Sequence, residues 1–481
     1  MNYRMIAYVL GNMMKYEALM MVLSLIVAII YKEYSVLWAF LLPMAILLII
    51  GLGLSYKMPK DRSFHAREGF VTVALSWIVV SAFGALPFWL DGSIPSYVSS
   101  FFETVSGFTT TGATILTDVE ALPLSLLFWR AFTHWVGGMG ILVFVLTILP
   151  RSGGSSIYLM KAEMPGTTVE KLVSKVRPTV RILYGIYLGL TIIMIVLLVL
   201  AGMPLFDSII NTMSTAGTGG FSLYNTSIAH YDSALIDGII TVFMLVFSIN
   251  FNLYFLIIIG KARSAIKSED LRWFLIIVAA AMLLITLDIR GLYDGDFLTS
   301  FRYAAFTVSS VISTTGFATA DFNLWPSFSK TLILLLMFIG ACAGSTGGGI
   351  KVSRWIILFK SAISELKKMA RPRQVTTLKF EGKPLAAQTE KSVYTYLVIY
   401  AFIVVVAVVL LSLEPFDFLT DFSAVATCIN NVGPGLNLVG PVENFSIYSP
   451  FSQIVLSFCM LAGRLEVFPL LMLFTPFTWK K

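Results

Sequence analysis

Four short stretches of small and hydroxyl-bearing residues are the part of this sequence best suited to binding chemistry. They read SGFTTTGAT from Ser106, STAGTGGFS from Ser214, SVISTTGFAT from Ser310 and TCINNVGPGL from Thr427. None of them contains a charged residue, so their main ligand atoms are backbone carbonyl and hydroxyl oxygens. Carbonyls of extended strands replace the hydration shell of an alkali cation, and glycine permits backbone conformations that a Cβ atom obstructs. The stretches therefore predict a site for an alkali cation without charged ligands.

The four stretches share one alignment. With Gly112, Gly220, Gly316 and Gly433 in register, a hydroxyl residue lies six positions earlier in every copy, and these residues are Ser106, Ser214, Ser310 and Thr427. The second copy also permits an alignment on Gly217 or Gly219, but Gly220 is preferred because Phe221 then matches Phe317. The fourth copy departs most from the others, so we expect only approximate fourfold symmetry. The alternative is that these glycines are small-residue contacts between helices.

The predicted ligands are the four glycines and the two residues before each. They are Thr110, Thr111, Gly112, Thr218, Gly219, Gly220, Thr314, Thr315, Gly316, Asn431, Val432 and Gly433. The threonine hydroxyls can add oxygen ligands or pack the strands from behind. A short helix before each strand would direct its negative C-terminal end at the site and favour a cation there.

The elements that position these stretches must cross a membrane. Hydrophobic residues make up 57% of the 481 residues and charged residues 13%, and the mean hydropathy is +0.84, whereas about a quarter of a soluble domain is charged. Apolar windows of about 20 residues, enough to span a bilayer, recur along the whole chain. We place spans near 17–31, 36–56, 70–90, 125–149, 180–203, 235–259, 271–289, 329–363, 393–413 and 450–475, the first being retained rather than removed as a signal peptide.

The basic residues predict the orientation of these spans. Of the 34 Lys and Arg residues, the only ones outside the segments 57–69, 151–181, 260–272, 351–391 and the two ends are Lys32, Arg130, Arg290, Arg302, Lys330 and Arg464. Because Lys and Arg gather on the cytoplasmic side of membrane proteins, both termini are expected in the cytoplasm. The same bias explains the net charge of +7, so nucleic acid is not an expected partner.

The order of spans and stretches predicts a repeat. Each stretch follows a span and a semi-apolar segment too short to cross the bilayer, and another span follows it. The predicted fold is an all-α polytopic membrane protein in which a two-helix leader, 1–66, precedes four span, pore helix, span repeats at 67–150, 151–260, 261–391 and 392–481. Four similar elements would then converge on one pseudo-fourfold axis.

The eighth span predicts a break. It is about twice the spanning length and holds Gly340, Gly344, Gly347, Gly348 and Gly349 in its middle. Each interior glycine costs a helix about 1 kcal/mol relative to alanine, so we expect two half-helices and a loop below the cation site. A phosphate-binding loop is excluded because the GxxxxGK[ST] pattern fails, and glycine-mediated packing is the alternative. Arg464 is expected near the middle of the last span, where a charge is usually functional or paired.

Other function classes lack their residues. Cys342, Cys428 and Cys459 lie in apolar context without CxxC spacing, and the three histidines are scattered, so no zinc site, disulfide framework or catalytic constellation is indicated. The chain is therefore not expected to be an enzyme or to bind an organic cofactor. An alternating-access carrier for a small solute, or a sodium-coupled cation carrier, remains the alternative function.

The chain also resembles a known family. The segments TTTGAT, GTGGFS, STTGFATADFNLWP, NNVGPGLN, GACAGSTGGGIKVSR and GRLEVFPLLMLFTPFTW are similar to the TrkH branch of the Trk/Ktr/HKT potassium transporters, over essentially the whole chain and including the two-span leader. The resemblance implies a potassium-channel-like fold, potassium uptake across a bacterial inner membrane, a homodimer with one pore in each subunit, and regulation by a cytosolic nucleotide-binding TrkA-type subunit.

The resemblance also implies roles for particular residues. In this family, glycine in all four copies accompanies potassium, which places potassium at Thr111, Gly112, Gly219, Gly220, Thr315, Gly316, Val432 and Gly433. The family's gate corresponds to an intramembrane loop and an arginine, here Gly340, Gly344, Ser345, Thr346, Gly347, Gly348, Gly349, Lys351 and Arg464.

Overall fold

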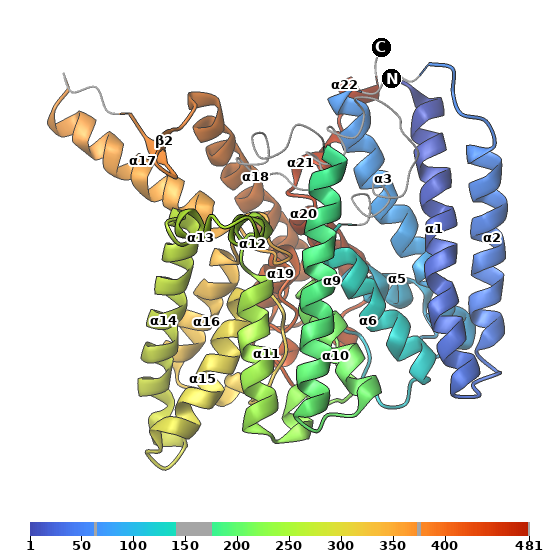
Figure 1. Ribbon diagram of the computed structural model, residues 1–481, viewed down its shortest axis with the longest axis horizontal. Coiled ribbons are helices and arrows are strands. Elements are labelled where there is room, and N and C mark those ends of the chain that lie inside the picture. Colours follow the sequence, from blue (N-terminus) through green and yellow to red (C-terminus); the bar gives the residue numbers. More distant parts are fainter. Residues whose placement is uncertain (62–64, 141–175, 373–376, 480–481) are drawn as a thin grey trace.

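The computed structural model of the chain describes residues 1–61, 65–140, 176–372 and 377–479, and these residues are mostly helical (Figure 1). Six of the described helices are long and apolar enough to cross a membrane, or seven when one bent pair counts as a span. Strands in this part of the chain form one antiparallel hairpin, β1 (Lys379–Phe380) with β2 (Lys383–Pro384). The expected all-α polytopic membrane fold is confirmed.

The leader consists of α1 (Tyr3–Ile30) and α2 (Leu37–Ser55), which lie side by side at the right of Figure 1. Their backbones touch, because a Cβ atom added at Gly11 would lie 2.9 Å from the Gly51 carbonyl oxygen, and one added at Gly51 would lie 2.8 Å from that of Gly11. Such small-residue contacts are typical of membrane helices. The leader also holds repeat 1, since the Glu33 carboxylate accepts hydrogen bonds from the Leu124 and Ser125 amides (2.7 and 3.0 Å) at the start of α6.

The same order of elements recurs four times after the leader: a first helix, a short helix at the place expected for a pore helix, a stretch without regular secondary structure, and a second helix. Repeat 1 has α3 (Ala66–Gly84) with α4 (Leu86–Asp91), α5 (Tyr97–Phe108) and α6 (Leu124–Gly138); repeat 2 has α9 (Val176–Leu200), α10 (Leu205–Gly217), α11 (Ala234–Phe247) and α12 (Phe251–Ile258). Repeat 3 has α13 (Ala262–Ile266), α14 (Glu269–Ile289), α15 (Phe297–Ile312), α16 (Ser327–Ile339) and α17 (Val352–Ala370); repeat 4 has α18 (Ala387–Leu411), α19 (Phe418–Asn430), α20 (Pro450–Arg464), α21 (Phe468–Met472) and α22 (Pro476–Trp479). Short 3₁₀ turns lie in the connections, at η2 (Ser227–Tyr231), η3 (Arg290–Leu292), η4 (Phe322–Leu324), η5 (Asn437–Val439) and η6 (Phe445–Ile447).

The pore helices α5, α15 and α19 begin at side-chain caps. Ser96 accepts from the Ser99 amide (3.4 Å), Asp296 from the Leu298 and Thr299 amides (3.1 and 3.2 Å), and Asp417 from the Thr420 amide (3.2 Å). A capping side chain satisfies amides that have no partner inside the helix. Each of these helices therefore starts at a fixed residue, which sets where its C-terminal end delivers the following strand.

In repeats 2, 3 and 4 the second helix is shorter than the about 20 residues that a straight membrane span needs. The expected span 235–259 is wrong as one straight helix, because α11 and α12 are bent by 91° between Phe247 and Phe251. The expected span 329–363 is interrupted between Ile339 and Val352. In the expected span 450–475, α20 ends at Arg464, since Glu466 and Val467 take positive φ values of 52° and 70°. Arg464 is therefore at a helix end and not in the middle of a span. The second half of the expected span 125–149 lies outside the described residues.

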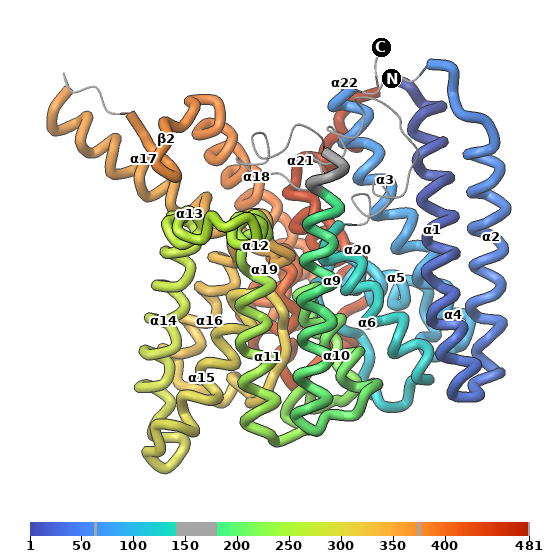
Figure 2. The backbone as a smooth tube through the Cα atoms, viewed as in Figure 1, coloured from blue at the N-terminus to red at the C-terminus, as the bar shows by residue number. Residues whose placement is uncertain are grey.

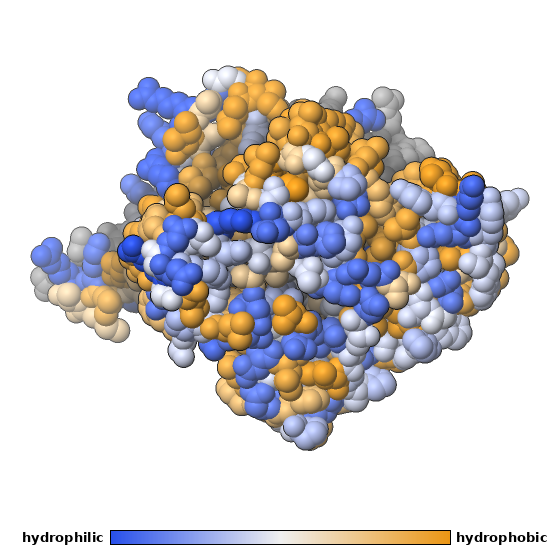
Figure 3. All heavy atoms as spheres, turned by 90° about the horizontal axis from the view of Figure 1, so that it is seen from below, coloured by the Kyte–Doolittle hydropathy of each residue, from blue (hydrophilic) through white to orange (hydrophobic). Residues whose placement is uncertain are grey.

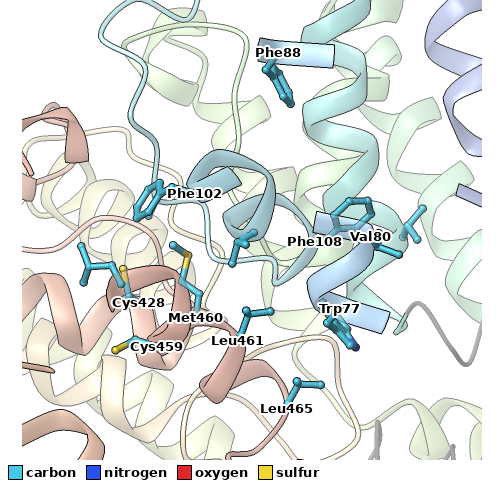
Figure 4. Packing of buried hydrophobic residues seen from close by; sticks show 14 of the residues in the cluster. Trp77, Val80, Phe88, Phe102, Phe108, Cys428, Cys459, Met460, Leu461 and Leu465 are labelled. Carbon is cyan, nitrogen blue, oxygen red and sulfur yellow. The ribbon is translucent and has the colours of Figure 1, made fainter. Parts of the chain in front are cut away.

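Repeats 1 and 4 share one hydrophobic core. Figure 4 shows Trp77, Val80, Phe102 and Phe108 of repeat 1 near Cys428, Cys459, Met460, Leu461 and Leu465 of repeat 4, and all of them are almost fully buried. Chain ends also meet, because the rings of Tyr3 and Trp479 stack with their centroids 6.4 Å apart. The last repeat thus closes onto the first one and completes a ring of repeats.

The two ends of the molecule differ in shape. At the upper left of Figures 1 and 2, α17 and the β hairpin project beyond the bundle. The opposite face, seen from below in Figure 3, mixes hydrophilic and hydrophobic residues. Around the sides, leucines and isoleucines such as Leu19, Ile49 and Ile192 are exposed, as expected for surfaces in contact with lipid.

Candidate functional site

Residues 110–112, 218–220, 314–316 and 431–433, here called the glycine strands, have the same backbone conformation. In each strand the first and third residues have positive φ: Thr110 56° and Gly112 82°, Thr218 58° and Gly220 78°, Thr314 60° and Gly316 86°, Asn431 55° and Gly433 105°. Positive φ is uncommon for residues with a Cβ atom and is a strained state for threonine. The structure therefore gives the four glycines equivalent places.

The hydroxyl residue six positions before each glycine holds the strand through its backbone. Its carbonyl accepts a hydrogen bond from the middle residue of the strand: Thr111 to Ser106, Gly219 to Ser214 and Thr315 to Ser310 at 2.8 Å, and Val432 to Thr427 at 2.9 Å. The side chains differ between copies. The Ser310 hydroxyl donates to the Phe317 carbonyl (2.6 Å) and the Thr427 hydroxyl to the Pro434 carbonyl (3.2 Å), so two copies add a second support.

The four glycine strands are arranged as a closed ring. A Cβ atom added at Gly112 would lie 2.0 Å from the Gly219 carbonyl oxygen, one at Gly220 would lie 2.0 Å from that of Thr315, one at Gly316 would lie 2.3 Å from that of Val432, and one at Gly433 would lie 2.9 Å from that of Thr111. Each glycine thus faces the next strand's backbone, and the fourth strand faces the first. The contacts leave no room for a side chain at these positions.

The threonine hydroxyls of the strands bond to protein atoms. Thr110 and Thr218 donate to the carbonyls of the residues before them (2.7 and 2.6 Å). The Thr111 hydroxyl lies 2.8 Å from that of Thr109 and accepts a hydrogen bond from the Asn431 side-chain nitrogen Nδ2 (2.9 Å). Of the two roles expected for the hydroxyls, the described contacts correspond to packing and orienting the strands.

A cavity of about 110 Å³ opens at one end of the ring. Its lining includes all four glycines, Gly112, Gly220, Gly316 and Gly433, together with residues of the loops that follow each strand. We call this cavity the vestibule. The last residue of every glycine strand therefore borders the same cavity.

A buried ion pair supports the first two strands where they meet the vestibule. The Arg130 Nε lies 2.6 Å from the Glu103 carboxylate, and both side chains are at most 3% exposed. Glu103 also accepts hydrogen bonds from the Thr114 hydroxyl and the Ile115 amide, each at 3.0 Å, while Arg130 donates to the Ser222 carbonyl (3.2 Å). Glu103 lies within α5, so its carboxylate acts as the structural partner of Arg130. The sequence shows neither the pairing nor its place.

His134 lies directly behind the second strand. Its Nδ1 lies 2.7 Å from the Gly107 carbonyl oxygen, and its ring stacks on Phe221 with centroids 4.1 Å apart. A Cβ atom added at Gly219 would lie 2.4 Å from the imidazole ring. The histidine thus fixes the position of this strand by contact.

Residues 340–351, here called the Gly-rich loop, connect α16 to α17 and fill the bend between α11 and α12. The Cys342 amide donates to the Ser248 carbonyl (3.1 Å), the Thr346 hydroxyl to the Phe247 carbonyl (3.0 Å), and the Phe251 amide to the Gly344 carbonyl (3.1 Å). Backbone groups that the bend leaves unpaired are thereby satisfied, as the interior of a membrane protein requires. The bend in repeat 2 and the break in repeat 3 stabilise each other.

The Gly-rich loop also touches the third glycine strand and the residue directly before the fourth. The Gly348 amide donates to the Thr314 hydroxyl (2.6 Å), and the Gly349 amide donates to the Asn430 carbonyl (3.0 Å). A Cβ atom added at Gly348 would lie 2.3 Å from the same Asn430 oxygen. The loop therefore lies against the ring on the side away from the vestibule.

Arg464 connects the Gly-rich loop to repeat 1. Its guanidinium donates to the Thr346 carbonyl (2.8 Å) and to the carbonyls of Gly137 and Gly138 at the end of α6. Lys351, the last residue of the loop, donates to the Gly347 carbonyl. Glu466, two residues after Arg464, forms an ion pair with Arg354 on α17. The predicted gate residues are thus gathered in one place, with cationic groups on loop carbonyls.

Two groups of contacts at the loop escape sequence reasoning. Asn250 occupies the bend of α11 and α12, and a Cβ atom added at Gly344 would lie 3.0 Å from its side-chain oxygen. Asp270, at the start of α14, accepts a hydrogen bond from the Ala343 amide (3.1 Å). Both contacts join residues that are more than 70 positions apart in the chain. Their only signal in the sequence is a polar residue beside an apolar run.

Comparison with known proteins identifies the family and supports the overall fold. The TrkH family model, described as a cation transport protein, matches residues 37–481. The chain is 36% identical to the Trk system potassium uptake protein TrkH of Salmonella typhimurium over 100% of both chains, and 34% identical to the Trk system potassium uptake protein TrkG of Escherichia coli over 99% of both. The crystal structure of the potassium transporter TrkH from Vibrio parahaemolyticus superimposes with a TM-score of 0.89 over 100% of both chains, at 34% identity. This chain belongs to the TrkH family of cation transport proteins and is a multi-pass membrane protein.

Proposed function

We propose that this protein takes up potassium ions through the ring of glycine strands. The observation that carries the proposal is the closed ring of four equivalent strands, whose glycines all line the vestibule. Relatives similar over the full length are named potassium uptake proteins, which supports the same ion here.

The chemistry of the ring suits a dehydrated alkali cation. Extended strands supply carbonyl oxygens in place of water, and the pore helices α5, α10, α15 and α19 end directly before the strands, so that their negative C-terminal ends add a favourable potential. No charged ligand is required. Glycine at the last position of all four strands favours potassium over sodium, as the family resemblance implies.

The Gly-rich loop and Arg464 act as the gate in this proposal. The loop lies against the ring on the side away from the vestibule, and the Arg464 guanidinium binds one of its carbonyls. A fixed positive charge next to the exit of a cation site raises the barrier for the next ion. Movement of the loop away from Thr314 would open the exit.

The cellular setting is also a proposal. The concentration of Lys and Arg in alternate connections supports cytoplasmic termini, and the family resemblance implies a bacterial inner membrane. The relatives' names refer to a Trk system, which supports a partner subunit. A cytosolic, nucleotide-binding TrkA-type regulator and a homodimeric functional form are what the family resemblance implies.

Cation flux in proteoliposomes tests the proposed function. Potassium, rubidium, sodium and lithium are compared for the native protein, Gly112→Ser and Gly316→Ser. Selective potassium and rubidium flux that becomes unselective in both variants is the expected result. Selectivity that is unchanged in both variants would mean that the glycines are packing contacts, and the alternating-access carrier would replace the channel.

A further inference from the structure

The β hairpin at the projecting end of the molecule is firmly attached to the amino end of α14. Glu381 and Gly382 form its two-residue turn with φ values of 52° and 73°, the conformation of the tight turns that suit hairpins. Phe380 is 7% exposed and belongs to the core cluster that includes Phe274 of α14 and Val393 of α18. The hairpin is therefore packed, although it projects beyond the bundle.

Glu381 caps α14 from outside that helix. Its carboxylate accepts hydrogen bonds from the Ser268 hydroxyl (2.8 Å) and from the amides of Glu269 and Asp270 (3.0 and 3.2 Å). An anion at a helix amino end is favourable because it satisfies free amides and complements the helix dipole. Lys360 of α17 donates to the Lys379 carbonyl (2.9 Å) and forms an ion pair with Glu269, which offsets the repulsion between these acids.

The capped helix end also holds the Gly-rich loop. Asp270 is 5% exposed, and one of its carboxylate oxygens accepts from the Ala343 amide (3.1 Å). Five residues further along the loop, the Gly348 amide binds the Thr314 hydroxyl of a glycine strand (2.6 Å). An unbroken series of contacts therefore runs from the hairpin through α14 and the loop to the ring.

We propose that Glu381 and Asp270 are positioning residues that hold the Gly-rich loop against the glycine strands, so that displacement of the hairpin releases the loop. This inference rests on the proposed function of the loop as a gate. Ordering of the α14 amino end by Glu381 keeps Asp270 in place, and Asp270 keeps Ala343 in place. Loss of either carboxylate leaves the loop with fewer bonds in its position against the ring.

Basal potassium flux in proteoliposomes, without any cytosolic subunit, is the first readout. Glu381→Ala and Asp270→Ala should each raise it about tenfold, since loss of a hydrogen bond to a charged group changes a two-state equilibrium by about that factor. The double variant should add little to the larger single effect, because both residues act on the same contact series. Lys383→Ala, on the same hairpin with an exposed side chain, is the matched control and should leave flux unchanged.

Conservative variants separate positioning from loss of folding. Glu381→Gln and Asp270→Asn keep an oxygen that can accept the same amides, so they should recover most of the native behaviour. If they behave like the alanine variants while the melting temperature falls in all four, the residues stabilise the fold only and the proposal is overturned.

Thiol labelling gives a readout that does not depend on conduction. Ser345→Cys, in a chain with Cys342, Cys428 and Cys459 replaced by alanine, reports loop exposure through its reaction rate with a maleimide. Glu381→Ala should raise the rate about tenfold, matching the flux change. An unchanged rate overturns the positioning role even if the native protein conducts potassium selectively. A native protein that shows no potassium flux, but a raised labelling rate in Glu381→Ala, contradicts the proposed function alone.

Discussion

The glycine strands and the Gly-rich loop both depend on glycine, but for different reasons. In the strands each glycine faces a carbonyl oxygen of the next strand, and the same local backbone conformation occurs in all four copies. In the loop, Gly344 faces the Asn250 side chain. Gly340 and Gly349 face each other, because a Cβ atom added at either one would lie within 2.8 Å of the Cα atom of the other. The strands are thus specified by a repeated local conformation, and the loop by contacts that occur once.

The largest effect is expected from a side chain in the ring. Gly220→Ala places a methyl group 2.0 Å from the Thr315 carbonyl oxygen at a φ of 78°. The methyl group must displace the Thr315 carbonyl, which is a proposed potassium ligand. Because a loss of about 1.4 kcal/mol in ligand energy is tenfold, the potassium to sodium flux ratio should fall at least about tenfold. Gly238→Ala, in α11 of the same repeat with nothing within 4 Å, is the control. Equal ratios in the two variants would show that the ring does not require glycine.

Loss of the buried ion pair should have the next largest effect. Arg130→Met leaves the Glu103 carboxylate buried without its cation, which destabilises a protein by about 3–5 kcal/mol. Thermal or denaturant unfolding in detergent measures this change. Glu103→Gln combined with Arg130→Met should restore part of the stability, because no unpaired charge remains. If the double variant is as unstable as the sum of the single ones, the pair does not act as a unit and the strands depend on the ring contacts alone.

A moderate effect is expected where the two regions meet. Thr314→Val keeps the shape of the side chain but removes the acceptor of the Gly348 amide. Loss of that bond, worth about 1 kcal/mol, should raise basal potassium flux about fivefold and leave selectivity in place. Thr286→Val, in α14 of the same repeat, is the matched control, since this buried hydroxyl donates to the Met282 carbonyl of its own helix. Similar basal flux in both variants would show that the hydrogen bond between the loop and Thr314 does not control conduction.

The smallest effect concerns the loops around the vestibule. The hydrogen bond from the Asn225 side chain holds the pKa of Asp118 below its usual value. A lowered pKa in the folded protein contributes stability above the unfolded value, about 3.9, and this contribution is lost as the pH falls through the folded pKa. The melting temperature difference between the native protein and Asp118→Asn should therefore stay constant from pH 8 to about 5 and shrink below about 4. A difference that changes between pH 8 and 5 would require another titrating group.

Features of the glycine strands and the Gly-rich loop that depend on local conformation can be predicted from the sequence. Alignment of Gly112, Gly220, Gly316 and Gly433 can be found because a repeated conformation leaves a repeated residue pattern. The interruption between Ile339 and Val352 is visible because glycines within an apolar run oppose helix formation. Both features follow from local preferences of the chain.

Features that depend on distant partners could not be predicted. The bend after Phe247 has only Ser248 and Asn250 as local signals, and its cost is offset by the Gly-rich loop, about 100 residues away in the chain. Arg464 was expected in the middle of a span because the residues that follow it are apolar, whereas the chain turns at Glu466, whose partner is on α17. The hydropathy of a segment predicts whether it is buried. It does not identify the distant residue whose contacts allow a helix to end inside the protein.

The contacts around the ring have a direction. Each glycine faces the strand that follows it in the chain, and the fourth faces the first, so the ring has a handedness that approximate fourfold symmetry alone does not give. A larger residue in one copy displaces the carbonyl of the next copy rather than its own. Changes in ion preference during evolution would therefore require compensating changes in the following copy, and paired substitutions in successive strands should be tolerated better than the same substitutions in opposite ones.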